Sequence, residues 1–410
     1  MRILWVKAGK LLPVDTGGKI RSYNLLSQLA KKHALAFLSY YGGPRDLTYE
    51  AEIAQEFPGA ATLHVPWMDG NALRNLLNYF QRVPSPYPFA VTKFTAQEVR
   101  EFITAALSER HFDVAICDFL SASLNFPLQT AVPVILFQHN IESELWARLA
   151  ETESNWLRRA VYKVEAAKMV RYEAAAVGRF QHVMAVSDRD RSQMMGMTSP
   201  EQITVIPTGV NLEKYRRAGN STILSNLVIF TGSMDWEPNI DGVEYFCGEI
   251  WPRVLGRIPD AKFRIVGRNP HARVQKLQSD SVEITGTVPS VIDHLKEAAA
   301  FVVPLRAGGG TRLKIYEAMA MGKAVVSTSI GAEGLDVHHG QDLLLCDDPR
   351  SFADGIAALL TDPKLREQLG SSAASLAARY DWSQITDSCS ELFKQVAFTA
   401  EQKFVAQTTR

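Results

Sequence analysis

Short apolar runs recur along the chain, and each is followed by a segment whose apolar residues have helical spacing. The first run, Arg2–Val6, precedes a helix that begins near Lys19, with Ile20, Leu25 and Leu29 on one face. Later runs are continuous in hydrophobicity, as in strands of parallel sheets that helices cover on both faces. They are Ala34–Tyr40, Ala61–Val65, Asp113–Cys117, Val132–Phe137 and His182–Val186. The pattern predicts an α/β fold.

The alternation restarts after Ile203–Tyr215, which reads ITVIPTGVNLEKY. Pro207 and Gly209 interrupt the end of a strand there, as expected of a crossover between domains. The strands expected beyond it are Asn226–Thr231, Lys262–Val266, Val282–Thr285, Ala300–Val303, Ala324–Ser327 and Asp342–Cys346. The helices expected are Pro349–Leu360, Pro363–Tyr380 and a last one from Asp381. We therefore predict two domains, residues 1–208 and 209–380, and a C-terminal helix over about 381–410.

A glycine-rich loop follows the strand Ala300–Val303. Gly308, Gly309 and Gly310 have no Cβ, so a ligand can approach their backbone closely. Thr311 suits the N-cap of the next helix, whose dipole and free N–H groups favour an anion. The loop predicts a phosphate site, although three glycines alone would also suit a simple tight turn.

Charged residues near this loop extend the prediction. Arg312 and Lys314 add cations beside the turn, and Glu317 lies one turn further into the helix. A carboxylate there could accept hydrogen bonds from a sugar diol. The segment therefore indicates a ligand with both a phosphate and a hydroxylated ring, such as a nucleotide sugar.

The segment 304–335, PLRAGGGTRLKIYEAMAMGKAVVSTSIGAEGL, resembles the donor site of retaining glycosyltransferases of family 4. Those enzymes have the GT-B fold, two Rossmann-like βαβ domains facing a cleft. The resemblance implies that Glu317 contacts the donor ribose. It also implies that the first domain binds the acceptor and is completed by the C-terminal helix. The family usually has a second Glu where this chain has Gly309, and its I-P-N-G-V-D junction has Thr208 and Asn211 here.

The resemblance assigns further donor-binding residues at the ends of strands. By position, Gly17 and Gly18 face the donor phosphates from the first domain, although the dinucleotide pattern GxGxxG is absent. Gly232 and Ser233 follow the first strand of the second domain, where the family often has an Arg and a Lys. We therefore expect Arg312 and Lys314 to stabilise the diphosphate. Two more candidates follow the next strands: Arg268 and Val288.

His139 and Asp118 each follow a predicted strand of the first domain. Ligands of open α/β sheets gather at the carboxyl ends of strands, so both side chains are expected to point toward the cleft. The resemblance implies that His139 contacts the transferred sugar. A purely structural role is the alternative for each residue.

Two stretches combine aromatic or apolar residues with basic ones. Pro66–Thr95 could line an acceptor pocket or touch a bilayer, or form a helical pair with its aromatic side in the core. Glu142–Phe180 is a long helical region that could face a membrane, or present a solvated surface. Its basic residues are Arg158, Arg159, Lys163, Lys168 and Arg171.

Composition excludes several classes of protein. Apolar residues make up 46% of the chain, and 44 basic residues balance 44 acidic ones, so nothing indicates nucleic-acid binding. No run approaches the about 20 apolar residues of a membrane span. The four cysteines have no metal or redox spacing, as in a reduced cytoplasmic protein. No Asp-x-Asp pair stands beside the predicted diphosphate site, so we expect no obligatory metal or other cofactor.

We interpret the chain as a hexosyltransferase-type enzyme of polysaccharide biosynthesis. It would move a sugar from a nucleoside diphosphate sugar to a glycan or lipid-linked acceptor, with retention, either free in the cytoplasm or peripherally at the inner membrane face. Two alternatives stay open. A nucleotide-sugar 2-epimerase would need extra acid/base residues around the sugar, and a non-catalytic nucleotide-binding protein would explain Gly309 in place of the family's Glu.

Overall fold

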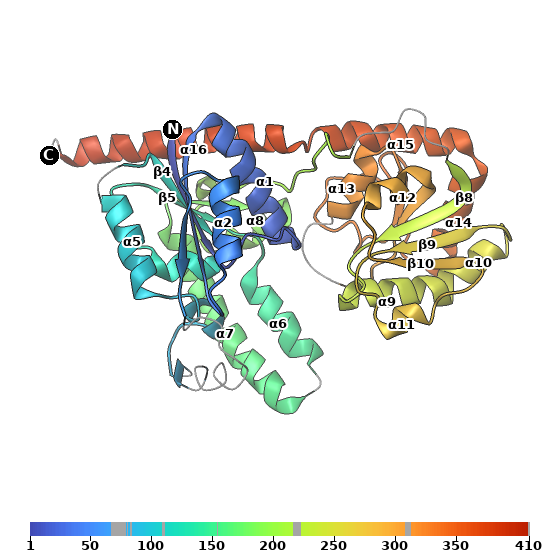
Figure 1. Cartoon of the computed structure of the whole chain (residues 1–410), viewed down its shortest axis with the longest axis horizontal. Coiled ribbons are helices and arrows are strands. Elements are labelled where there is room, and N and C mark those ends of the chain that lie inside the picture. The colour runs from blue at the N-terminus through green and yellow to red at the C-terminus, as the bar shows by residue number, and fades with distance from the viewer. Residues whose placement is uncertain are drawn as a thin grey trace. The chain divides into compact units, whose positions relative to one another are not determined.

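The computed structural model describes residues 1–66, 79, 81–82, 84–108, 111–153, 155–215, 223–307 and 313–408 (Figure 1). The chain divides into two compact units. The N-terminal unit comprises residues 1–207 and 385–410, and the C-terminal unit comprises residues 208–384. Each unit is built on a parallel sheet, which confirms the predicted α/β fold.

The sheet of the N-terminal unit has the strand order β3-β2-β1-β4-β5-β6-β7. Its strands are β1 (Arg2–Ala8), β2 (Ala34–Tyr41), β3 (Ala61–His64), β4 (Val114–Asp118), β5 (Val134–Phe137), β6 (His182–Ala185) and β7 (Ile203–Val205). All neighbouring pairs are parallel. The register of β1 and β4 sets Lys7 opposite Asp118, and the two side chains form an ion pair.

Helices cover both faces of this sheet. They are α1 (Gly17–Lys32), α2 (Leu47–Glu56), α4 (Phe89–Thr92), α5 (Gln97–Ser108), α6 (Glu142–Thr152), α7 (Trp156–Arg179), α8 (Asp188–Met194) and α16 (Trp382–Thr408), whose first residues belong to the C-terminal unit. A 3₁₀ segment, Leu120–Asn125, follows β4.

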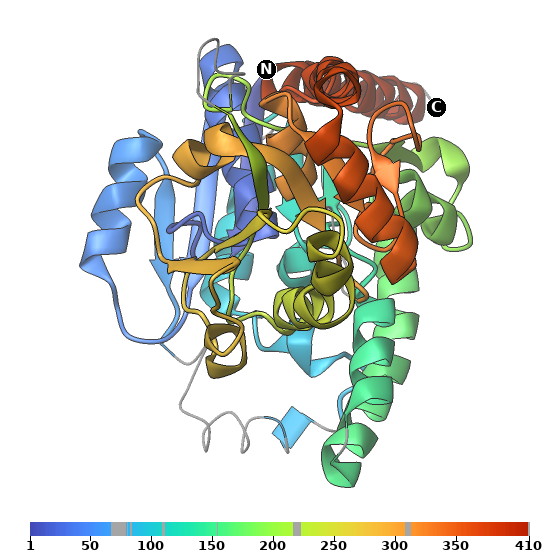
Figure 2. The same cartoon turned by 90° about the vertical axis from the view of Figure 1, so that its right-hand side faces the viewer.

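The long helical region predicted for Glu142–Phe180 is a hairpin of α6 and α7, which lie side by side in both views (Figures 1 and 2). Asn155 caps α7 by accepting hydrogen bonds from the N–H groups of Leu157 and Arg158. This cap explains why one helical pattern becomes two helices. The rings of Trp146 and Tyr162 meet edge to face at 5.8 Å across the hairpin.

The segment Pro66–Thr95 falls partly outside the described residues, including Trp67. In the part that is described, the rings of Tyr79 and Phe89 meet at 5.5 Å. Phe94 packs against the hydrophobic core of the N-terminal unit. These contacts favour the interpretation in which the aromatic side of the segment faces the protein interior.

The sheet of the C-terminal unit has the order β10-β9-β8-β11-β12-β13, again all parallel. Its strands are β8 (Leu224–Thr231), β9 (Lys262–Val266), β10 (Val282–Gly286), β11 (Ala298–Val303), β12 (Ala324–Ser327) and β13 (Leu344–Leu345). Its helices are α9 (Glu237–Tyr245), α10 (Trp251–Leu255), α11 (Ala272–Gln275), α12 (Val291–Glu297), α13 (Leu313–Ala320), α14 (Pro349–Thr361) and α15 (Pro363–Ala378).

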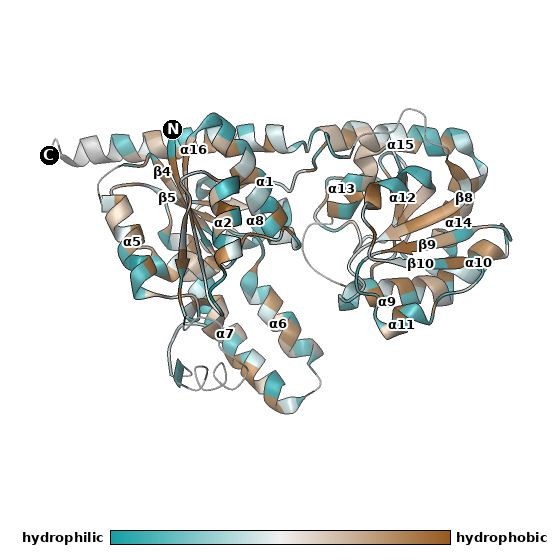
Figure 3. Cartoon of the chain, in the orientation of Figure 1, coloured by the Kyte–Doolittle hydropathy of each residue, from teal (hydrophilic) through white to brown (hydrophobic). Residues whose placement is uncertain are grey.

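The core of the C-terminal unit explains why its strands are continuous apolar runs. Every residue of β11 is buried, as required of a central strand with helices on both faces. Phe230, Phe246, Phe263 and Phe301 are fully buried around it, and the apolar colour of β8 and β9 is visible in Figure 3. Within the described residues, no helix has both the length and the apolar character needed to cross a bilayer.

Helix α15 approaches the turn before β12 so closely that only a glycine fits at Gly370. A Cβ built there would collide with the carbonyl oxygen of Gly322. We predict that Gly370→Ala lowers the free energy of unfolding by about 1–3 kcal/mol, because a backbone must shift to admit the methyl group.

The measurement is urea unfolding of the full chain. Gly248→Ala is the matched control, since a Cβ at Gly248 meets no atom within 4 Å. Equal unfolding midpoints for the two variants would show that α15 is not packed as described.

Candidate functional site

The loops after β8 and β9 lie together in the C-terminal unit. The backbone N–H of Gly232 donates to the carbonyl of Val266 over 3.0 Å, and a Cβ at Gly267 would collide with the carbonyl of Gly232. Arg268 Nε donates to the hydroxyl of Ser233 over 2.8 Å. Three residues predicted to bind the donor therefore stand side by side, because parallel strands end at one edge of the sheet.

Lys314 reaches the same edge from the first turn of α13. Its Nζ donates to Asn239 Oδ1 over 2.9 Å, and Asn239 Nδ2 donates to the carbonyl of Ser233 over 2.8 Å. A Cβ at Gly232 would lie 2.8 Å from Lys314 Nζ, so the ammonium group rests against the glycine backbone. Nζ also lies 4.3 Å from the centre of the Phe230 ring, within cation–π range.

Asn239 is a residue that the sequence analysis missed. It is 2% exposed, and its two hydrogen bonds connect the Ser233 loop with the Lys314 side chain. The only sequence signal was its place at the start of a helix that follows a glycine-ended strand. Asn239 holds the cation where an anion at the strand ends would meet it.

Glu317 lies one turn beyond Lys314 on α13. Burial raises the pKa of its carboxyl group, against the opposing effects of a hydrogen bond from the Tyr215 hydroxyl and of the charges of Lys214 and Lys314. The pKa of Tyr215 is raised as well, by burial and by the charge of Glu317. Tyr215 was not predicted as a site residue, and it orients the carboxylate assigned to the sugar diol.

Five residues assigned to the donor loop lie outside the described residues. They are Gly308, Gly309, Gly310, Thr311 and Arg312. Val288 follows β10 and packs, half-buried, against the hydrophobic core of the C-terminal unit. The roles of all six residues stay predictions.

In the N-terminal unit, Asp118 is a fully buried carboxylate with four hydrogen-bond donors. Lys7 Nζ and Trp5 Nε1 donate to Oδ2 over 3.2 and 3.1 Å, and Ser22 Oγ donates over 2.7 Å. His139 Nε2 lies 2.7 Å from Oδ1. Burial alone would raise the pKa of Asp118, but Lys7, His139 and Ser22 together hold it well below its usual range. The residue therefore anchors a buried network.

The network fixes the protonation of His139. The ionised Asp118 can only accept, so Nε2 of the imidazole carries the proton and Nδ1 has a free lone pair. None of the described residues hydrogen bonds to Nδ1. Burial lowers the pKa of His139 to about 4, against the opposing effect of Asp118. At neutral pH the residue is therefore an uncharged imidazole.

Phe119 covers this histidine. The two rings stack at 3.7 Å with an angle of 4° between their planes, and His139 is only 1% exposed. Phe119 has a φ of 74°, an unfavourable conformation for a bulky residue that persists only where its surroundings enforce it. The ring also fills the space beside Gly18, where a Cβ would collide with it. The contact of His139 with a sugar stays a prediction.

Gly17 and Gly18 occupy the first turn of α1, directly after Thr16. A Cβ at Gly17 would meet no atom within 4 Å, in contrast to Gly18. Open space at Gly17 therefore admits a ligand, whereas Gly18 is needed for the packing of Phe119. The contact of either glycine with a phosphate stays a prediction.

An Asp-x-Asp sequence occurs in the N-terminal unit, at Asp188 and Asp190, although not beside the predicted diphosphate loop. Both residues belong to the first turn of α8, where the positive end of the helix dipole stabilises acidic side chains. Ser187 caps this turn by accepting from the Asp190 N–H over 3.1 Å. Among the described residues, no group of three or more His, Cys, Asp or Glu is placed to hold a metal ion.

The state of His139 makes stability depend on pH. We predict that the free energy of unfolding falls as the pH drops from about 6.5 to about 4, because the unfolded chain then binds a proton that the folded chain excludes. Each unit by which folding lowers the pKa contributes about 1.4 kcal/mol. His182 acts in the same sense, since burial lowers its pKa to about 4.

Urea unfolding at pH 7 and pH 5 measures this effect. His139→Gln should reduce the loss of stability between the two pH values by about 2 kcal/mol. His111→Gln, at an exposed histidine of the same unit, should leave the loss unchanged. The same loss in His139→Gln as in the parent protein would mean that His139 is protonated in the folded state.

Family models match most of the chain. The model described as Glycosyltransferase Family 4 matches residues 17–214, and the one described as Glycosyl transferases group 1 matches residues 225–362. The first match ends at residue 214 and the second begins at residue 225, a few residues beyond Pro207 and Thr208, where the two compact units meet in sequence.

Curated relatives include a phosphatidyl-myo-inositol mannosyltransferase of Mycobacterium leprae, 28% identical over 54% of this chain and 61% of the relative. An uncharacterized 44.6 kDa protein in the cps region of Klebsiella pneumoniae is 25% identical over 60% of this chain and 65% of its own length. A D-inositol 3-phosphate glycosyltransferase of Thermobispora bispora is 25% identical over 64% of this chain and 65% of its own length. The matched stretches thus span less than two thirds of each relative.

Solved structures share the fold over nearly the whole chain. Alr3699/HepE of Anabaena in complex with UDP has a TM-score of 0.67 at 15% identity, covering 96% of this chain and 100% of the other. Sucrose-phosphate synthase of Thermosynechococcus elongatus has a TM-score of 0.68 at 17% identity, and the match covers 98% of this chain and 100% of the other. None of these relatives and neighbours is named as an epimerase. The chain belongs to glycosyltransferase family 4 and has the GT-B fold.

Proposed function

We propose that this chain transfers a sugar from a nucleoside diphosphate sugar to a hydroxyl acceptor, with retention of the anomeric configuration. The observation that supports it best is the position of Lys314 against Gly232 and Ser233, at the carboxyl edge of the C-terminal sheet. Solved structures of one structural neighbour, Alr3699/HepE of Anabaena, are complexes with UDP and with UDP-glucose. A donor diphosphate at this edge would meet a cation that is already held in place.

Breaking the anomeric bond leaves negative charge on the diphosphate. A cation positioned before the reaction stabilises that charge without reorganisation, which is where such sites lower the barrier most. Lys314 would provide it, and Asn239 would keep its Nζ in position. Arg268, through its contact with Ser233, would add a second positive charge. Glu317 would bind the ribose diol once Tyr215 shares or releases its hydrogen bond.

Retention would follow from attack on the same face that the diphosphate leaves. We propose that no covalent intermediate forms. His139 would accept a hydrogen bond from a sugar hydroxyl through its free Nδ1. Because the residue is 1% exposed, side chains that bury it would have to move to admit the sugar.

We further propose a glycan or lipid-linked acceptor and a role in polysaccharide biosynthesis. The names of two relatives describe transfer to phosphatidylinositol and to inositol phosphate, and a third relative comes from a cps region. The four cysteines are unpaired, which supports a reducing compartment such as the cytoplasm.

The outer surface of α7 supports contact with a membrane. Its two acidic residues, Glu165 and Glu173, are both buried. Glu165 accepts from the Phe89 N–H over 2.6 Å, and Glu173 accepts from Gln138 Nε2 over 2.6 Å. Exposed side chains of the helix are apolar or basic, and include Trp156, Leu157, Arg158, Arg159, Lys163, Val164, Val170 and Arg171. We propose that this face rests on an anionic bilayer.

Loss of Lys314 should reduce turnover more than donor binding. We predict that Lys314→Ala lowers kcat about a hundredfold while the Kd for the nucleoside diphosphate changes far less, because charge on the diphosphate grows in the transition state. Steady-state kinetics and titration calorimetry with a donor panel measure the two effects. Lys276→Ala, at an exposed lysine of the same unit, is the control. Unchanged kcat with a higher KM would instead indicate uniform binding.

Activity should not require a divalent ion, because Lys314 and Arg268 supply the charge that would otherwise be needed at the diphosphate. We predict that EDTA leaves the rate of sugar transfer unchanged. A rate that falls on chelation and returns with magnesium or manganese would contradict this proposal.

Charge reversal on α7 should weaken vesicle binding. We predict that Lys163→Glu combined with Arg171→Glu lowers the affinity for phosphatidylglycerol-containing vesicles about tenfold or more, since each basic residue near such a surface contributes about 1 kcal/mol. Lys276→Glu with Lys364→Glu, two exposed lysines of the C-terminal unit, should keep the parent affinity. Equal cosedimentation of both double variants would refute the membrane contact.

A further inference from the structure

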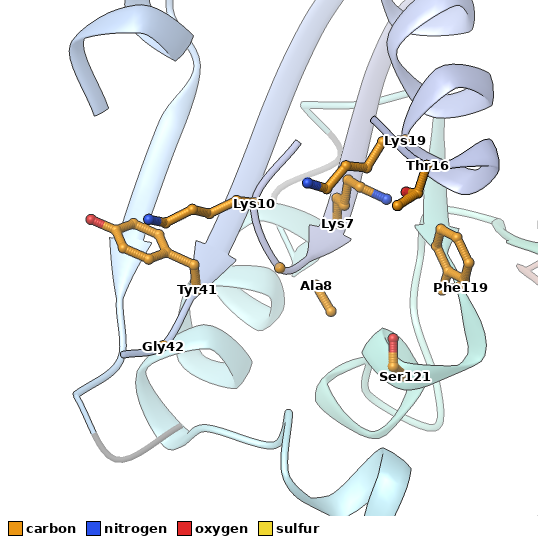
Figure 4. Close-up of a pocket in the computed structure, with 10 residues that line it drawn as sticks. Lys7, Ala8, Lys10, Thr16, Lys19, Tyr41, Gly42, Phe119 and Ser121 are labelled. Carbon is orange, nitrogen blue, oxygen red and sulfur yellow. The ribbon is translucent and has the colours of Figure 1, made fainter. Parts of the chain in front are cut away.

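A pocket of about 430 Å³ opens in the N-terminal unit at the ends of β1 and β2 (Figure 4). Lys10 and Tyr41 stand on one side of it, and Phe119 and Ser121 on the other. Lys7 and Lys19 complete the wall between them, next to Thr16. The pocket is large enough for one phosphorylated monosaccharide. It lies apart from Lys314 in the chain and is built entirely from the N-terminal unit.

The charged residues that line the pocket are all basic. Three lysines line it, and none of the described residues that line it is acidic. Each lysine is paired with a carboxylate that does not line the pocket: Lys7 with Asp118 at 3.2 Å, Lys10 with Asp46 at 2.7 Å, and Lys19 with Asp15 at 3.0 Å. Because Lys7 is only 3% exposed, the wall presents chiefly the ammonium groups of Lys10 and Lys19 to a ligand.

Two of the three lysines can exchange their partners at little cost. The Lys10–Asp46 and Lys19–Asp15 pairs are both partly exposed, with 24–39% of each side chain accessible, and such pairs add little to stability. A phosphate carries a larger charge and more acceptor oxygens than one carboxylate. It can therefore attract both ammonium groups from the open side of the pocket.

The remaining wall suits a hydroxylated ring. Phe119 is half-buried and offers an aromatic edge, and the hydroxyl groups of Thr16 and Ser121 can donate or accept hydrogen bonds. Gly9 and Gly42 leave the rest of the rim free of side chains. A Cβ at Gly9 would meet no atom within 4 Å. This combination fits a phosphate attached to a sugar or polyol better than a bare phosphate.

We propose that this pocket binds a phosphorylated sugar or polyol ring of the acceptor, with Lys10 and Lys19 on the phosphate and Phe119 against the ring. The assignment to the acceptor rests on the proposed function. The same chemistry can come from a free sugar phosphate or from a lipid headgroup, and the experiment separates these two sources.

The test is titration calorimetry of the full chain with glucose 6-phosphate, glucose and inorganic phosphate. Glucose 6-phosphate should bind more tightly than either of the other two probes. Lys10→Gln and Lys19→Gln should each weaken it about tenfold, the loss of one charge-assisted hydrogen bond. Lys31→Gln is the matched control, since Lys31 lies on α1 like Lys19 but outside the pocket.

A second arm uses vesicles of phosphatidylinositol in phosphatidylcholine, with phosphatidylglycerol vesicles as the reference for general surface charge. Weaker binding of the two lysine variants to the phosphatidylinositol vesicles, but not to the reference, indicates a lipid-borne ring. Lysine-dependent binding of the soluble probe alone indicates a free sugar phosphate. Either result supports the proposed site. If neither the soluble probe nor the phosphatidylinositol vesicles bind in a way that depends on the two lysines, the proposal is wrong.

Two further readouts keep the claims separate. Displacement of glucose 6-phosphate by UDP would mean that the pocket takes donor phosphates, which overturns the assignment to the acceptor. Donor hydrolysis by the unaltered protein is measured in the same preparation. Its absence counts against the proposed function, whereas failure of the sugar phosphate to bind counts against the pocket alone.

Discussion

The hydrogen bond from Lys314 to Asn239 is the interaction on which the proposed chemistry depends. A lysine side chain has four rotatable bonds, so a cation that must meet a diphosphate has to be held before the ligand arrives. Asn239 does this while it also holds the Ser233 carbonyl. The absence of a side chain at Gly232 gives the ammonium group its room. Position, rather than the number of charges, distinguishes this edge of the sheet.

The N-terminal unit applies the same physical rule to a buried carboxylate. Asp118 is tolerated in the interior because four donors compensate for its lost hydration. In return it orients Lys7 and fixes the tautomer of His139. Phe119 closes over both, at 4.4 Å from Lys7 Nζ and 3.7 Å from the imidazole. One residue thus sets the charge and geometry of both the histidine and the inner wall of the lysine pocket.

The fold could be predicted from the sequence because parallel strands buried on both faces are continuous apolar runs, as in Ala300–Val303. Lys314 and Ser233 were recognised as candidates, each from its local motif. Their proximity was not predictable, because it depends on the order β9-β8-β11 and on a contact across 75 residues through Asn239. Phe119 escaped notice for a different reason: its role follows from a φ of 74° and a stacked ring, which no residue pattern reveals.

A crystal structure of the chain with a nucleoside diphosphate tests the central claim most directly. The account predicts phosphate oxygens within hydrogen-bond distance of Lys314 Nζ, with the Lys314–Asn239 bond retained and the phosphates beside Gly232 and Ser233. A diphosphate bound elsewhere on the chain, with no phosphate oxygen near Lys314 Nζ, would contradict it.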